Sequence, residues 1–367
     1  MPIRAANRAE AARLKRAFEA AGAQAIEAPI LLPAETLLDL YGEDIRARAY
    51  VTSDALRGEQ MLRPDFTVPV VQMHMAHGAE PARYTYAGEV FRRQEDDAAR
   101  ANEYLQVGYE IFDRDNPAAA DAEVFGLIQA ALNGLPVRAA TGDIGILTAA
   151  VAGLNTTERR KAALMRHIWR PRRFRALIER YSGRAPVPAS RAALLAAGDP
   201  FADAGPEIGL RSRAEVEARI AALRADAAAP VIAAGEVALM DALLSVRETM
   251  PFALARLRDI AVDMPAIRTA VERLEARGAA LSQRGVDVEA LEFEASYGRT
   301  QMEYYDGFVF GFYAEARPDL PAVATGGRYD ALTRRLGQGS GRPGGEIPAV
   351  GGVVRPGLML DLREGRG

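Results

Sequence analysis

Polar side chains alternate with apolar ones along one short stretch of the sequence. Apolar residues occupy every second position, at Leu105, Val107, Tyr109 and Ile111. Because the side chains of a strand point alternately to opposite faces, Gln106, Gly108 and Glu110 fall together on the other face. An amide, a carboxylate and a glycine without a side chain form a floor that a small polar ligand could approach closely. A solvent-facing strand would show the same alternation, so this pattern alone leaves both interpretations open.

The segments before this strand would position further polar groups beside it. Thr67 is a candidate cap for a helix over Val68–His77, which Gly78 would end. The aromatic and β-branched residues of Arg83–Arg92 predict a strand. The segment 93–103 is almost entirely polar. We therefore expect a loop there, lying in solvent or over a ligand.

Several of these segments resemble the histidyl-tRNA synthetases, which are class II synthetases. RPDFT (63–67), Phe91-Arg92 and NEYLQVGYE (102–110) are similar to motif 2 of that fold. EYYDGFVFGFY (303–313) and TGGRYDAL (325–332) resemble the two histidine-specific segments of those enzymes, and the order of the segments matches. The resemblance implies an α+β fold, with a class II synthetase-like antiparallel sheet flanked by helices.

The resemblance also implies a binding site for histidine. Asp65, Thr67 and Gln106 match the positions that hold the ammonium group, although the family has glutamate where this chain has Asp65. Glu110 and Tyr305, with Tyr304 and Tyr329 alongside, match the positions around the imidazole, and Arg92 matches the motif 2 arginine. Acidic and amide oxygens suit an ammonium group, while a carboxylate and a phenol suit the ring nitrogens.

At the positions that bind ATP in the synthetases, this sequence differs from the family. Thr300 and Leu358 stand where the resemblance would place two arginines that neutralise ATP phosphates. Arg355 lies three residues before Leu358, and Pro356 is expected to disrupt the start of the helix there, so we do not expect Arg355 to substitute. The loop 94–97 (QEDD) is acidic and would repel a triphosphate. The sequence also ends at residue 367 without the anticodon-binding domain of the synthetases, so we expect no tRNA partner.

Two functions of different classes follow. The chain resembles the regulatory subunits of ATP phosphoribosyltransferase, which implies a non-catalytic protein with L-histidine as its effector and no cofactor. Its expected partner is the short-form catalytic subunit, in a hetero-oligomer, expected to be a hetero-octamer, with a homodimer core. The alternative is a synthetase-like ligase that activates an amino acid without acting on tRNA. A class II-like scaffold without a ligand is a third interpretation.

Motif 1 would build the homodimer. The segment 23–42 (AQAIEAPILLPAETLLDLYG) resembles that motif, which forms the dimer interface in class II synthetases. A strand to Pro29 followed by an ordinary helix would explain the same residues. The preceding helix, Ala9–Ala21, should bury Leu14 and Phe18 and end at Gly22.

The composition of the chain argues against several kinds of site and several cellular locations. The chain has no cysteine, which rules out disulfides, thiolate metal sites and a cysteine nucleophile. Its N-terminus lacks the apolar core of a signal peptide and no apolar run reaches spanning length, so we expect a cytoplasmic protein without a membrane partner. No carboxylate near His74 and His77 in the sequence completes a ligand set with them, and we expect no metal site. The formal net charge of −3 argues weakly against nucleic acid.

The domain organisation predicted from these patterns has three parts. Residues 1–153 and 287–367 form the two pieces of the synthetase-like domain, and residues 154–286 form a helical insertion. Within the insertion, Ser212 and Glu215 form a capping box, and Gly278 should end a helix that follows Pro265. Nine basic residues surround Trp169 over 158–180, either as a solvated helix face or as a surface for an anionic partner. Asp306-Gly307 is either a hairpin turn or part of a strand.

Overall fold

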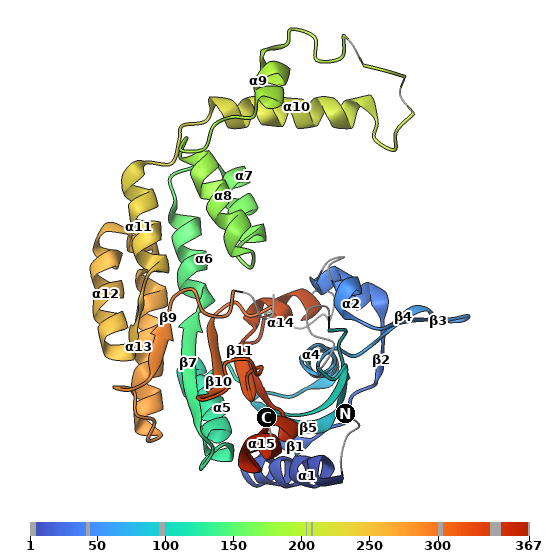
Figure 1. Ribbon diagram of the computed structural model, residues 1–367, viewed down its shortest axis with the longest axis vertical. Coiled ribbons are helices and arrows are strands. Elements are labelled where there is room, and N and C mark those ends of the chain that lie inside the picture. Colours follow the sequence, from blue (N-terminus) through green and yellow to red (C-terminus); the bar gives the residue numbers. More distant parts are fainter. Residues whose placement is uncertain are drawn as a thin grey trace.

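The computed structural model describes residues 5–41, 45–94, 100–202, 204–206, 208–299, 304–337 and 346–365. Over these ranges the protein combines a large mixed sheet with helices on both faces and an elongated helical extension (Figure 1). Within the described ranges, no helix has both the length and the apolar character that crossing a bilayer requires. The α+β architecture and the mainly antiparallel sheet agree with the sequence-based expectation.

A nine-stranded sheet forms the base of the molecule. Its spatial order is β1-β5-β6-β12-β11-β10-β7-β9-β8, and only the β1–β5 and β7–β9 pairs are parallel. The strands are β1 (Gln24–Ala25), β5 (Ala82–Phe91), β6 (Glu103–Phe112), β7 (Val137–Asp143), β8 (Arg247–Thr249), β9 (Glu292–Glu294), β10 (Phe308–Ala314), β11 (Ala324–Arg328) and β12 (Ala349–Val354). The central strands β6, β12, β11 and β10 are buried on both faces, which explains their nearly continuous apolar and glycine content.

Helices cover both faces of this sheet. On one face lie α1 (Ala5–Ala20), α5 (Pro117–Ala131) and α15 (Pro356–Arg363), where the ring of Phe18 contacts that of Tyr109. On the other face lie α4 (Thr67–His77) and α14 (Asp330–Gly337). The predicted helix near the N-terminus is confirmed, since Leu14 and Phe18 are buried and Gly22 follows it with a φ of +96°.

A smaller sheet stands apart from the large one. It has the order β2-β4-β3, built from β2 (Leu31–Pro33), β3 (Val51–Asp54) and β4 (Gly58–Leu62). Helices α2 (Ala34–Tyr41) and α3 (Ile45–Arg48) lie beside it, and the β3–β4 hairpin extends outward in Figure 1. The motif 1 segment therefore contributes two short strands, β1 and β2, on either side of Pro29, and the helix α2 that was predicted after them.

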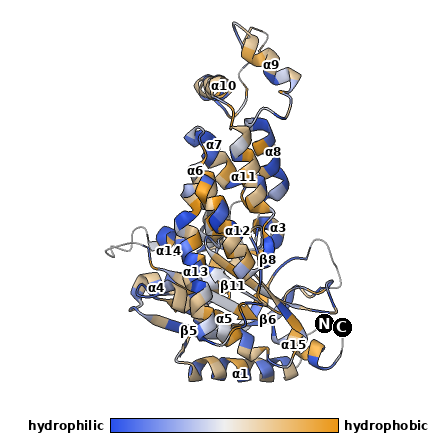
Figure 2. Cartoon of the chain, turned by 90° about the vertical axis from the view of Figure 1, so that its left-hand side faces the viewer, coloured by the Kyte–Doolittle hydropathy of each residue, from blue (hydrophilic) through white to orange (hydrophobic). Residues whose placement is uncertain are grey.

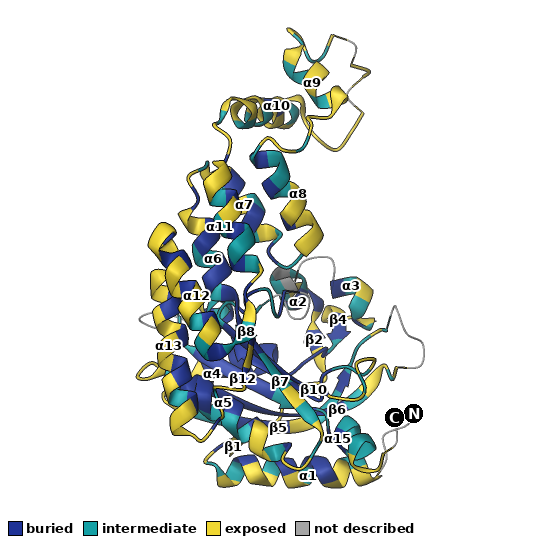
Figure 3. Ribbon diagram, turned by 60° about the vertical axis from the view of Figure 1, so that its left-hand side comes forward, coloured by how far each residue is buried: buried dark blue, intermediate teal, exposed yellow. Residues whose placement is uncertain are grey.

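Residues 144–283 are mostly helical and form the extension. They comprise α6 (Ile144–Gly153), α7 (Glu158–Arg166), α8 (Pro171–Tyr181), α9 (Ala189–Ala196), α10 (Arg213–Ala228), α11 (Ala234–Leu244), α12 (Met250–Asp263), the single 3-10 turn Pro265–Ile267 and α13 (Arg268–Gln283). Helices α9 and α10 lie at the end distant from the sheet and are largely exposed (Figure 3). Figure 2 shows that apolar and polar residues are mixed along this distant end. In contrast, α13 packs on α5, and β8 joins the edge of the large sheet.

A buried ion network ties α13 to the sheet. Arg277 on α13 is 3% exposed and contacts Asp121 and Asp143, each at 2.8 Å. Arg328 on β11 contacts the other oxygen of Asp121 at 2.6 Å. Each charge is thus compensated by an opposite one, which burial of ionised groups requires. Removal of one partner would leave a buried charge unpaired.

Several local expectations are corrected. Thr67 does not cap α4, because it is the first residue of the helix and its hydroxyl donates to Glu110 instead. Gly278 does not end a helix, since α13 continues to Gln283 and Gly278 lets the sulfur of Met250 pack closely. Pro356 does not disrupt a helix but begins α15, where its missing N–H is not needed.

Two further regions are now defined. Asp306 and Gly307 form neither a hairpin turn nor part of a strand, because Asp306 accepts hydrogen bonds from the backbone N–H groups of Asp330 and Ala331 just before β10 begins. In the basic stretch around Trp169, Arg160 is buried against Asp226 rather than solvated. The capping box of Ser212 and Glu215 is confirmed.

Candidate functional site

The polar face of β6 is buried beneath α4 rather than exposed to solvent. Gln106 and Glu110 are each 1% exposed, and Leu105, Val107, Tyr109 and Ile111 are buried on the opposite face. The predicted alternation is therefore confirmed, and a solvent-facing strand is excluded. Gly108, which lies between Gln106 and Glu110, does not make room for a ligand as the sequence predicts. A Cβ on Gly108 would lie 2.1 Å from Cζ of Tyr86, so the phenol of Tyr86 occupies the space we had assigned to a ligand.

Glu110 accepts hydrogen bonds from three hydroxyl groups. Its Oε1 accepts from Thr67 at 3.1 Å and from Tyr86 at 2.7 Å, while Oε2 accepts from Tyr329 at 2.6 Å. Burial raises the pKa of the Glu110 carboxyl to about 7, although these hydroxyls favour the ionised form and act in the opposite direction. Gly351 on β12 leaves the room that this carboxylate needs, since a Cβ there would lie 1.3 Å from Oε2.

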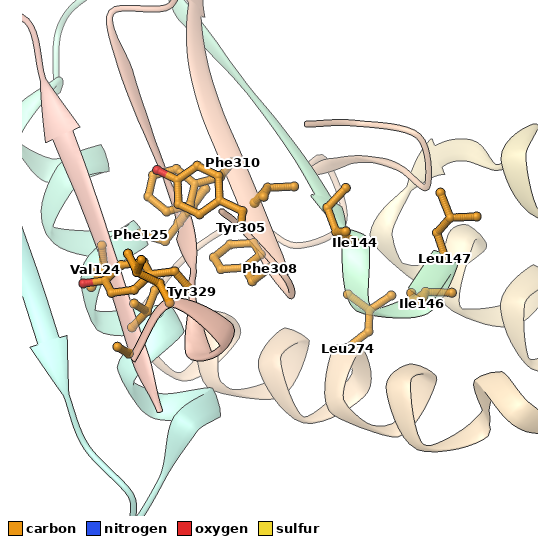
Figure 4. Packing of buried hydrophobic residues seen from close by; sticks show 14 of the residues in the cluster. Val124, Phe125, Ile144, Ile146, Leu147, Leu274, Tyr305, Phe308, Phe310 and Tyr329 are labelled. Carbon is orange, nitrogen blue, oxygen red and sulfur yellow. The ribbon is translucent and has the colours of Figure 1, made fainter. Parts of the chain in front are cut away.

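Tyrosine rings form the wall above the carboxylate. The Tyr304 hydroxyl donates to Thr67 Oγ1 at 3.4 Å, and the rings of Tyr304 and Tyr305 meet at a centroid distance of 4.8 Å. Tyr305 is 5% exposed, and Figure 4 shows it among the buried residues of the core, with Tyr329. Burial raises the pKa of Tyr305 above its ordinary value, so its hydroxyl stays protonated and can donate a hydrogen bond.

These groups enclose a cavity of about 350 Å³. It is lined by Asp65, Thr67, Arg92, Gln106, Tyr304, Tyr305, Tyr313, Pro321, Ala322, Thr325, Gly352, Val353 and Arg355. A cavity of this size suits a small ligand. Gln106 Oε1 has no hydrogen-bond partner among the described residues, although it is buried. A buried acceptor of this kind is costly unless a donor reaches it, and the cavity is where such a donor could lie.

Two arginines lie at the same cavity. Arg92 Nε donates to the backbone oxygen of Pro64 at 2.7 Å, and Arg355 donates to the backbone oxygen of Ala322. The sequence leads us to expect that Arg355 does not substitute for an arginine at 358, and that expectation stays a prediction. Arg355 nevertheless lines the cavity, because β12 runs antiparallel to β6 and its register pairs Val354, the residue before Arg355, with Val107.

The predicted site residues fall into two groups. Those that line the cavity are Asp65, Thr67, Arg92, Gln106, Tyr304 and Tyr305. Glu110 and Tyr329 lie beneath it and are joined to it through the hydroxyl of Thr67. The predicted set is thus brought together in space, whereas its role in binding stays a prediction.

Sequence reasoning missed Tyr86, Tyr313, Thr325 and Arg355. Tyr86 could have been found by pairing the two strands, because β5 and β6 place Tyr86 directly opposite Gly108. Tyr313 and Thr325 stand at the ends of the two segments that resemble the histidine-specific motifs, and Arg355 was considered only as a substitute for an arginine at 358, so none of the three was assigned to the cavity. Thr300 and the acidic residues at 95–97 lie outside the described residues. Among the described residues, no group of three or more His, Cys, Asp or Glu side chains could hold a metal ion.

Comparisons with known proteins agree with this architecture. A family model described as histidyl-tRNA synthetase matches residues 1–202 and 210–354. Proteins from Brucella ovis and Brucella abortus, each named ATP phosphoribosyltransferase regulatory subunit, are 31% identical over 360 residues, covering 90% of this chain and 92% of theirs.

Solved structures give the same fold. A Bacillus halodurans protein, described as an ATP phosphoribosyltransferase regulatory subunit/histidyl-tRNA synthetase, has a TM-score of 0.67 at 21% identity and covers 97% of this chain and 79% of its own. The histidyl-tRNA synthetase from Nostoc has a TM-score of 0.64 at 17% identity, covering 98% and 72%. The fold is therefore that of the class II synthetases. The chain belongs to the histidyl-tRNA synthetase family, in the branch of the ATP phosphoribosyltransferase regulatory subunits.

Proposed function

We propose that this protein is a non-catalytic regulatory subunit of ATP phosphoribosyltransferase and that it binds L-histidine in the cavity beside Gln106. Through that site it confers feedback inhibition on the short-form catalytic subunit, which carries out the first step of histidine biosynthesis. The proposed assembly is a cytoplasmic hetero-oligomer built on a homodimer of this chain. Residues 154–286 serve as an inserted helical domain in this proposal.

The observation that carries the proposal is the unpartnered oxygen of Gln106. It lies in a cavity that also presents the carboxylate of Asp65 and the hydroxyl of Thr67. The three oxygen groups that line this cavity match the three N–H donors of an ammonium group. An aliphatic or purely anionic ligand would leave the Gln106 oxygen unsatisfied.

The remaining groups suit the rest of an amino acid. Arg92 and Arg355 supply guanidinium groups for a carboxylate, since charge-assisted contacts of this kind are among the strongest hydrogen bonds in proteins. The phenols of Tyr304 and Tyr305 supply both an aromatic surface and hydroxyl donors for an imidazole ring. The cavity is therefore complementary to a zwitterion with a polar aromatic side chain, and histidine has these features.

The test is the histidine titration of a mixed enzyme. Phosphoribosyl-ATP formation by the catalytic subunit is measured with unmodified protein and with a Gln106→Leu, Tyr305→Phe double variant, which keeps the volume of both side chains. The variant should assemble and activate normally. Its half-inhibitory histidine concentration should rise about tenfold or more, because a hydrogen bond to a charged group is worth about 1.5–3 kcal/mol.

Gln129→Leu is the matched control, since Gln129 is exposed on α5 and does not line the cavity. It should leave the histidine response unchanged. If the double variant is inhibited as readily as the unmodified protein, histidine acts through other residues, and the cavity is a relic of the synthetase fold.

One observation favours the alternative of a synthetase-like ligase. Arg355 lies in the cavity with Arg92, so two guanidinium groups converge where a ligase would need them. The two functions differ in whether histidine is activated by ATP, which pyrophosphate exchange measures directly.

A further inference from the structure

A second cavity lies between the helical extension and the large sheet. Its volume is about 480 Å³. It is lined by Pro171, Phe174, Arg175, Leu244, Glu294, Ser296, Tyr297, Gly298, Arg299 and Tyr313. The lining therefore comes from α8, from the end of α11 and from the segment that leads away from β9. Tyr313 on β10 lines both this cavity and the one beside Gln106.

Glycines allow the segment 296–299 to lie closely on the sheet. Gly298 has a φ of +87°, and a Cβ there would meet Val309 at 2.9 Å. A Cβ on Gly311 would lie 2.2 Å from the hydroxyl of Tyr297. That hydroxyl instead forms a hydrogen bond of 2.8 Å with the hydroxyl of Tyr313. The close packing holds Arg299 in a defined position at the cavity wall.

Arg299 is a buried cation that forms no ion pair with a carboxylate of the described residues. It is 5% exposed, its Nε donates to the backbone oxygen of Ile168 at 2.8 Å, and its guanidinium carbon lies 4.8 Å from the ring centre of Phe174. Its Nη2 has no hydrogen-bond partner among the described residues. Burial and the nearby charge of Arg175 lower the pKa of Arg299 to about 10, so it stays charged at neutral pH.

The carboxylates nearby are bound to other groups. Glu294 accepts from the hydroxyl of Ser296 and lies 3.9 Å from Arg247. Asp241 accepts from Arg175. A buried guanidinium beside a second cation is unfavourable unless an anion compensates the charge. The cavity is large enough to admit one.

We propose that this cavity is a second ligand site, which binds the carboxylate or phosphate group of a small molecule between Arg299 and Arg175. The Nη2 atom of Arg299 donates one hydrogen bond to the oxyanion, and Arg175 at the open rim contributes a second charge-assisted contact. Phe174, Pro171 and Leu244 provide an apolar surface for the body of the ligand. The site is separate from the cavity beside Gln106, although both share Tyr313.

Calorimetric titration with inorganic phosphate, and separately with acetate, tests the site on the full-length protein in a buffer of low ionic strength. The binding of one anion per chain should depend on Arg299, and the tighter of the two probes identifies the oxyanion class. Arg299→Met should weaken binding about tenfold or more, and Arg175→Gln severalfold, because each removes a charge-assisted hydrogen bond.

Two control variants locate the binding. Arg172→Gln removes the same charge from the exposed surface of α8, outside the cavity, and should change the affinity by less than about twofold at moderate salt. Arg355→Gln removes a cation from the cavity beside Gln106 and should also leave the affinity unchanged. Circular dichroism checks that each variant is folded. If Arg299→Met does not fold, Arg175→Gln at the rim decides the question.

Three results would overturn the proposal. The first is that neither probe binds at millimolar concentration. The second is that Arg172→Gln and Arg175→Gln lose anion affinity equally. The third is that only Arg355→Gln loses anion affinity. The last result would assign the anion to the cavity beside Gln106. None of these results excludes histidine from the cavity beside Gln106, so the two proposals fail separately.

Discussion

At the scale of single residues, Glu110 is the centre of the hydrogen-bond network beneath the cavity, although it does not line the cavity itself. Three hydroxyls from α4, β5 and the segment after β11 converge on its carboxylate. It therefore fixes the position of Thr67, which does line the cavity. A change at Glu110 should affect the site indirectly, through the geometry of these hydroxyls, and should also affect stability.

The stability of the protein should depend on the protonation of Glu110. Its pKa is about 7 in the folded protein, compared with 4.5 for an exposed glutamate, because burial disfavours the charge. The folded state therefore binds this proton more tightly than the unfolded state. The resulting contribution to the free energy of unfolding is fully present below pH 4.5 and is lost as the pH rises through 7. By linkage it amounts to about 3 kcal/mol.

Glu110→Gln should flatten this part of the pH profile. Urea unfolding between pH 5 and 8 should show a smaller decline in the free energy of unfolding for the variant, by about 3 kcal/mol. The free energy of unfolding of the variant should still decline somewhat with pH, because burial beside Asp330 also raises the pKa of Asp306 to about 7. Glu272→Gln, on the exposed surface of α13, is the control. Identical profiles for Glu110→Gln and the unmodified protein would contradict the assigned pKa.

At the scale of elements, the motif 1 segment carries exposed apolar side chains at the edge of the small sheet. Ile30 and Leu31 are 45% and 48% exposed, and β2 is an edge strand of the order β2-β4-β3. Apolar residues on an edge strand favour association with another chain. We therefore expect the segment 22–40 to form the core of a homodimer.

Leu31→Asp should weaken that dimer. A charge in an apolar contact costs about 2 kcal/mol, which corresponds to about a 30-fold change in the dissociation constant. A two-fold interface contains each substituted residue twice, so the combined change should be several hundredfold. Sedimentation or light scattering at micromolar concentration measures the change. Val262→Asp is the control, because Val262 is 75% exposed on α12 and lies outside the segment. A monomeric unmodified protein would exclude the proposed homodimer.

At the scale of the whole molecule, the protein should form no adenylate. Thr300 and Leu358 replace two arginines that the family resemblance places at the ATP phosphates, and loss of even one such group commonly costs about a hundredfold in rate. Exchange of pyrophosphate into ATP in the presence of histidine should therefore stay at background, with an active histidyl-tRNA synthetase as the positive control. Exchange above background would instead support the ligase, with Arg355 in the role of a phosphate-binding group.

The sequence by itself determined the features that depend on neighbouring residues. The alternation along β6 separated the buried apolar face from Gln106 and Glu110, because side chains of a strand repeat every second position. The capping box at Ser212 and the end of α1 at Gly22 were predictable for the same reason, since caps are local hydrogen-bonding arrangements. The ordered motifs also indicated the α+β fold and the set of residues that gather at the cavity.

Only the tertiary structure decided how distant residues meet. Tyr86 fills the space over Gly108, Arg355 reaches the cavity of Arg92, and Arg299 is buried with its Nη2 unpartnered among the described residues. Gly278 similarly lies inside α13, where the sulfur of Met250 packs against it. Each outcome depends on packing between segments far apart along the chain. Local periodicity and capping carry no information about which partner will occupy a given space, because that choice is made by the close packing of the folded interior.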